Sequence, residues 1–179
     1  EYATSGQRSD QYFAEENFAQ MLSDSAEIAI VGYPFVNDIS QASGGYTDVD
    51  GNVITTANLL PIIMRRHRDR VARLVSAGKR VIVCTEPGAT TLSASAVGLV
   101  HHVNAAIRSS YRATQGVYVF DPVDLIWSRS TSDTAIVFQA GFSADGTHAT
   151  TRQGHVVGRY AVEHLFKVPV GSRQSYGVD

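Results

Sequence analysis

The stretch "DGTH" places Asp145 and His148 three residues apart, in a glycine-containing turn just before an expected helix. At this spacing the carboxylate can accept a hydrogen bond from the imidazole Nδ1. It then stabilises the imidazolium that forms when Nε2 takes up a proton. The pair is therefore a candidate for the acid–base half of a hydrolase. The alternative is an ordinary loop, because short Asp-x-x-His matches arise easily and an aspartate can simply cap a turn.

Two other positions are candidate hydrogen-bond donors to a negatively charged oxygen. Asn37 follows the apolar run 26–33, where the end of a buried strand would project it toward a site. Its side-chain amide could donate to an oxyanion. Gly6 would let a backbone N–H approach a substrate oxygen closely. The simpler interpretations are an Asx turn at Asn37 and a plain loop glycine at Gly6.

The elements that must position these residues follow from the hydrophobic pattern. Apolar runs predict a strand buried on both faces at 26–33, a second buried strand at 79–87 and a third strand at 116–122. Helical periodicity predicts helices over 10–22, 57–77, 94–114 and 151–166. The Gly-, Ser- and Asp-rich stretch 38–56 predicts a long loop.

Strands that alternate with helices predict an α/β fold, a three-layer α/β/α sandwich around a parallel sheet. We expect one domain over 1–179, with residues 168–179 as a tail. In such sheets the ligand site lies at the carboxyl ends of the strands.

Composition narrows the class of partner. The net charge of -2 at pH 7 gives no reason to expect nucleic acid or an anionic membrane as a partner. No apolar run of 18 or more residues is present, so no transmembrane span is expected. The single cysteine excludes an internal disulfide and leaves the compartment open.

Taken together and in this order, three stretches resemble conserved blocks of the SGNH, or GDSL-like, hydrolase family of esterases and acetylesterases. "YATSGQRS" resembles the second block, "FVND" the third, and "DGTH" the fifth, with "RQGH" continuing as in many members. "NAAIRSSY" followed by "VYVFDPVDL" resembles the region around the family's fourth strand. The resemblance covers residues 2–166 and implies a flavodoxin-like fold that hydrolyses an ester, with O-acetylated carbohydrate as the favoured substrate. It implies no metal and no organic cofactor.

The resemblance also implies roles for individual residues. His148 would be the general base and Asp145 its orienting partner, while the Gly6 N–H and the Asn37 amide would form the oxyanion hole. Phe35 departs from the family, which usually has glycine there, and would reshape the acyl pocket. Trp127 is a candidate wall of the substrate cleft.

The family's first block, Gly-Asp-Ser with the nucleophile, belongs well upstream of the Gly6 loop, and only five residues precede Gly6. Four serines are poor substitutes because of their expected positions or settings: Ser5, Ser9, Ser25 and Ser143. A strand order of 2-1-3-4-5 would make the run 26–33 the third strand and leave it with a bare apolar edge. We therefore expect an upstream segment, or a companion fragment, to complete the sheet and carry the serine.

Two other functions stay open at this point. A non-catalytic carbohydrate-binding or structural module would keep the fold and lack the nucleophile. A metal-dependent hydrolase would use Asp145, His148 and His155 as ligands.

Overall fold

The protein is described by a computed structural model that places residues 6–32 and 35–165; the expected tail at 168–179 lies outside these residues. A parallel sheet forms its centre, in the order β1-β4-β5. The strands are β1 (Ile28–Val31), β4 (Arg80–Cys84) and β5 (Val117–Phe120). In register, Ala29 pairs with Val81 and Val81 with Val117. The predicted α/β fold with a parallel sheet is confirmed.

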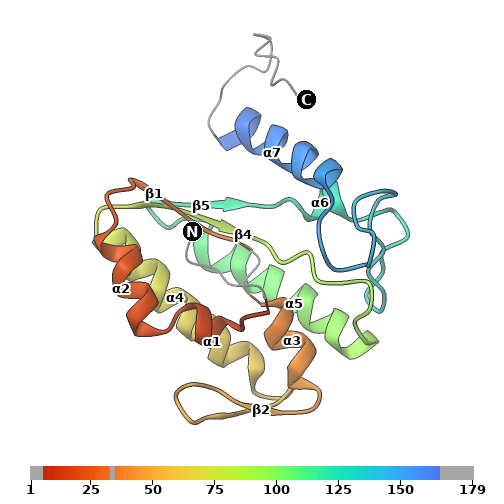
Figure 1. The fold of residues 1–179 in the computed structure, drawn as a ribbon, viewed down its shortest axis with the longest axis horizontal. Helices are drawn as coiled ribbons and strands as arrows, with labels where there is room; N and C mark the ends of the chain where they lie inside the picture. The colour runs from red at the N-terminus through yellow and green to blue at the C-terminus, as the bar shows by residue number, and fades with distance from the viewer. Residues whose placement is uncertain (1–5, 33–34, 166–179) are drawn as a thin grey trace.

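Helices cover both faces of this sheet, as Figure 1 shows. The first five lie on one side and the last lies on the other. They are α1 (Ser9–Tyr12), α2 (Glu15–Ser23), α3 (Val36–Ala42), α4 (Leu59–Ser76), α5 (Ala94–Tyr111), α6 (Val123–Ile126) and α7 (Thr151–Leu165), with the short α6 just after β5. None of these described helices is long and apolar enough to cross a membrane.

The two faces of the sheet belong to separate cores, because successive side chains of a strand point to opposite faces. Val81 and Val83 of β4 pack into the large core with α2, α4 and α5. Ile82 and Cys84 point the other way, into a small cluster under α7. There the Phe120 ring lies 5.8 Å from the ring of Tyr160.

The face under α7 is only partly covered. The prediction that the first strand is buried on both faces is wrong, because Ile30 is 59% exposed. The cause is the position of β1 at the edge of the sheet, with α7 packed on β4 and β5 instead. A narrow groove of about 120 Å³ runs beside β1, lined by Ile28 and Ile30 among others.

Two other local predictions are also wrong. The expected helix over 10–22 is broken, because Ala14 has an extended backbone with φ -53° and ψ 141°. The break lets Phe13 and Phe18 both enter the core. The expected loop over 38–56 contains most of α3 and a small hairpin of β2 (Tyr46–Thr47) and β3 (Val53–Ile54).

Candidate active site

The Asp145–His148 pair is formed as a direct contact. His148 Nδ1 lies 2.6 Å from Asp145 Oδ2. The other carboxylate oxygen accepts the backbone N–H groups of Thr147 and His148, at 2.9 and 2.8 Å. The imidazole contact, followed by these two backbone bonds, holds the pKa of Asp145 well below its usual range. An ionised carboxylate in this contact can stabilise a protonated imidazole.

Gly146 attaches this turn to the loop that follows β4. Its carbonyl accepts the Thr90 N–H at 2.8 Å. Its φ is +81°, and a Cβ there would collide with the Thr90 hydroxyl. A residue without a Cβ is therefore required at this position. The bond to Thr90 places the turn next to the loop after β4, at the carboxyl end of the sheet.

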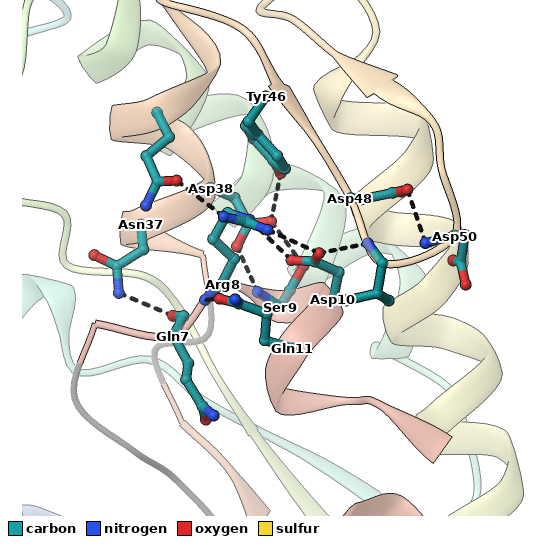
Figure 2. Close-up of polar contacts among 12 residues, drawn as sticks. Gln7, Arg8, Ser9, Asp10, Gln11, Asn37, Asp38, Tyr46, Asp48 and Asp50 are labelled. Carbon is teal, nitrogen blue, oxygen red and sulfur yellow. Dashed lines mark hydrogen bonds and ion pairs between the residues drawn. The ribbon is translucent and has the colours of Figure 1, made fainter. Parts of the chain in front are cut away.

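The Gly6 loop and Asn37 also come together. Asn37 lies in the first turn of α3, and its Nδ2 donates to the Gln7 carbonyl at 2.9 Å (Figure 2). An amide nitrogen carries two hydrogens, so this bond orients the group and leaves one hydrogen for another acceptor. Gly6 has φ +81° and is exposed. The two candidate oxyanion donors thus lie on adjoining segments.

Glu86 ties the Asn37 side of the site to the Asp145–His148 side. Its carboxylate is 1% exposed and accepts N–H groups from both sides. On one side the donors are Phe35 at 3.0 Å and Val36, at the start of α3; on the other the donor is Gly88 at 3.0 Å. Burial raises the pKa of Glu86, and these backbone bonds oppose the shift. Through Glu86, the 85–90 loop joins the start of α3 to the Asp145–His148 turn.

The side chain of Asn104 makes two hydrogen bonds to the backbone of Glu86. Its Oδ1 accepts the Glu86 N–H at 2.6 Å, and its Nδ2 donates to the Glu86 carbonyl at 2.9 Å. Asn104 lies on α5, so the loop is fixed to a long helix.

Phe35 and Trp127, the two expected substrate-binding residues, have different surroundings. The Phe35 ring is fully buried, 5.3 Å from the ring of His67, so it fills the core under the site instead of lining an open pocket. Trp127 is half-buried and donates its Nε1–H to the Pro87 carbonyl at 2.9 Å. With His101 it lines a surface cavity of about 360 Å³.

The serines considered as nucleophiles make other contacts. Ser9 Oγ donates to Asp38 at 2.9 Å, and Ser143 Oγ donates to Asp145 at 3.2 Å. Within 6–32 and 35–165, no serine hydroxyl is hydrogen-bonded to the ring of His148. Ser25 is exposed and precedes the amino end of β1, while Ser5 lies outside the described residues. The same described ranges hold no group of three His, Cys, Asp or Glu side chains placed to bind a metal ion.

Sequence reasoning missed Glu86, Asp38 and Thr90. A signal existed for Glu86, which is a charged residue directly after an apolar strand, where a ligand site is expected. Nothing in the local sequence distinguishes Thr90 from the other hydroxyl residues of its loop.

Comparison with known proteins adds one solved structure. No protein-family model and no curated protein sequence matches the chain. The chain is similar to a Bacteroides fragilis protein whose crystal structure was described as a "putative acylhydrolase", with a TM-score of 0.63 and 16% identity. The similarity covers 90% of this chain and 71% of the other. The chain therefore shares the fold of that protein.

Proposed function

We propose that this chain is the larger part of a serine ester hydrolase of the SGNH type, which removes acetyl or other short acyl groups from carbohydrate. The observation that carries the proposal is the 2.6 Å contact between His148 Nδ1 and Asp145, in a turn at the carboxyl end of the sheet. The fold shared with the Bacteroides fragilis protein supports it. The substrate class rests on the resemblance of the three motifs.

The proposed reaction has two balanced halves. A serine hydroxyl attacks the ester carbonyl, and its proton passes to His148 Nε2 while Asp145 stabilises the imidazolium. The Gly6 N–H and the Asn37 amide donate to the oxyanion until the sugar leaves with the proton. Water then attacks the acyl-enzyme in the same way and releases the carboxylic acid.

We place the serine on a strand upstream of Glu1 that pairs with the outer edge of β1. That edge carries the exposed Ile30 and the neighbouring groove. A strand added in parallel to β1 would end beside the start of α3, close to Asn37. An exposed apolar edge also favours aggregation, which a further strand would prevent.

The handedness of the sheet locates the helix that would follow this strand. The connections from β1 to β4 and from β4 to β5 keep their helices on one face. In the 2-1-3-4-5 order, the strand that carries the serine is followed by a second upstream strand on its far side, so this connection advances away from β1. Because parallel connections are right-handed, a connection in that direction runs over the other face of the sheet. A helix after the upstream strand would therefore lie beside α7 and cover Ile30.

Labelling of the full polypeptide with a fluorophosphonate, followed by intact-mass and peptide analysis, tests the proposal. We expect one phosphonyl adduct on an upstream serine and release of acetate from an O-acetylated oligosaccharide. His148→Ala should abolish turnover and labelling, whereas the matched control His155→Ala should keep both. Turnover retained in His148→Ala would refute the assignment of the base.

The alternative is a non-catalytic carbohydrate-binding module, favoured by the lack of a serine hydroxyl bonded to His148 in the described ranges. A full polypeptide that binds an oligosaccharide but shows no adduct and no turnover would support that alternative. Turnover that is lost on chelation and in His155→Ala would instead indicate the metal-dependent hydrolase.

A further inference from the structure

A network of polar side chains joins residues 7–11 to α3 and to the β2–β3 hairpin (Figure 2). At its centre is Asp38, the residue after Asn37, which is 0% exposed. Asp38 Oδ2 accepts the Ser9 backbone N–H at 2.7 Å. Asp38 Oδ1 accepts two hydroxyls, from Ser9 at 2.9 Å and from Tyr46 at 2.8 Å.

These bonds connect segments that are far apart in the sequence. Ser9 is 29 residues before Asp38 and begins α1, while Asp38 lies in the first turn of α3. Tyr46 comes from the hairpin that follows α3. A single carboxylate therefore joins the start of α1 to α3 and to the hairpin.

The three hydrogen bonds to the Asp38 carboxylate fix the position of Ser9 and Tyr46 relative to α3. A buried carboxylate that loses its donors carries a large desolvation penalty, so breaking any of these three bonds is costly. Burial raises the pKa of the Tyr46 hydroxyl, and the neighbouring Asp38 raises it further, so Tyr46 remains a donor. Burial also raises the pKa of Asp38, and the hydrogen bonds from Ser9 and Tyr46 act against that shift.

Arg8 supports the same junction from the solvent side. Its Nε and one terminal nitrogen bind the two oxygens of Asp10 at 3.0 and 3.1 Å. Its other terminal nitrogen donates to Gln41 Oε1 on α3 at 3.1 Å. The guanidinium carbon also lies 4.4 Å from the centre of the Tyr46 ring.

We infer that Asp38 is a positioning residue for the oxyanion hole: its carboxylate holds the Gly6–Ser9 loop against α3, at the separation that allows the Gly6 N–H and the Asn37 amide to reach one oxygen. Gly6 is three residues from Ser9, and Asn37 is the neighbour of Asp38. The Asn37–Gln7 bond joins the two segments at the same junction. The catalytic consequence rests on the proposed function; the hydrogen bonds that hold the loop to α3 do not.

Asp38→Asn in the full polypeptide tests this inference. The amide offers one acceptor in place of two, so the loop should lose its fixed separation from α3. We expect kcat for a small aryl acetate to fall by about 10- to 100-fold, because loss of an entire oxyanion donor costs about 100- to 1000-fold. KM should change by less than about threefold, since positioning of the oxyanion donors acts mainly in the transition state.

The matched control is Asp48→Asn. Asp48 is also buried and also accepts backbone N–H groups, from Asp50 at 3.0 Å and from Asn52 at 2.7 Å, but in the hairpin turn. Its kcat should stay within about twofold of the wild type, apart from any loss of stability. If Asp38→Asn does not fold, Ser9→Ala and Tyr46→Phe each remove one hydroxyl donor and should lower kcat by a smaller factor.

A second measurement is independent of turnover. The backbone amide signals of Gly6 and Gln7, which are distant in sequence from residue 38, should shift in Asp38→Asn and stay in place in Asp48→Asn when followed by NMR. Unchanged signals in a folded Asp38→Asn protein would overturn the inference. An inactive wild type in which these signals still shift would refute the hydrolase function and leave the positioning role supported.

Discussion

His67 provides a test of the fold that needs no knowledge of the substrate. It lies on α4, is 0% exposed, and its Nδ1 is 2.7 Å from the Tyr111 hydroxyl. The rings of Phe13 and Phe35 pack around it, at 6.1 and 5.3 Å. Nε2 is buried and has no hydrogen-bond partner among the described residues. Burial, assisted by the charge of Arg68, lowers the pKa of His67 to about 3.

This shift makes stability depend on pH in a defined direction. The unfolded chain binds a proton at His67 below its ordinary pKa of 6.5, whereas the folded chain stays neutral down to about pH 3. Folding stability from this residue is therefore complete above pH 6.5 and is lost as the pH falls. The loss is about 1.4 kcal/mol per pH unit, or about 2 kcal/mol at pH 5.

The variant His67→Gln is neutral at every pH and can still bond to Tyr111. Urea unfolding, followed by the fluorescence of Trp127 at steps from pH 7.5 to 4.5, measures the free energy of unfolding of both proteins. The difference between them should shrink by about 1.4 kcal/mol per unit as the pH falls below 6.5. Other titrating groups cancel in this difference.

The exposed His102 on α5 supplies the control. His102→Gln makes the same replacement at an exposed side chain and measures the effect of the substitution itself. If His67→Gln and the wild type have parallel stability curves over this range, His67 is not held neutral by burial, and the packing described around it is incorrect.

Two further predictions concern the turn and loop at the candidate site. Gly146→Ala places a Cβ against Thr90 at a positive φ, so urea unfolding should show a loss of about 1–3 kcal/mol, and ester turnover should fall because the Asp145–His148 turn moves. Unchanged turnover would mean that the position of this turn does not matter. Glu86→Gln offers a single oxygen to the backbone N–H groups on its two sides and should cost about 1–3 kcal/mol at pH 8 by the same assay. An equally stable variant would show that Glu86 does not join the two sides of the site.

Local sequence determined the parts of this protein that depend on neighbouring residues. The spacing in "DGTH" predicted a contact between Asp145 and His148, and the described contact is 2.6 Å long. The period of apolar residues predicted a helix over 57–77, which is present as α4, and Gly78 follows it with φ +82°. Such features are set by the geometry of one turn or one helix face, so the sequence alone contains the information.

The tertiary structure decided whatever depends on residues that are distant in the chain. Glu86 and Phe35 are 51 residues apart, and Asp38 and Ser9 are 29 apart, so neither contact leaves a periodic signal. The burial of Phe35 and the break at Ala14 likewise follow from how the core is filled. A carboxylate in a loop and one buried among backbone N–H groups look alike in a sequence. Only packing determines which one loses its water and must bind the donors around it.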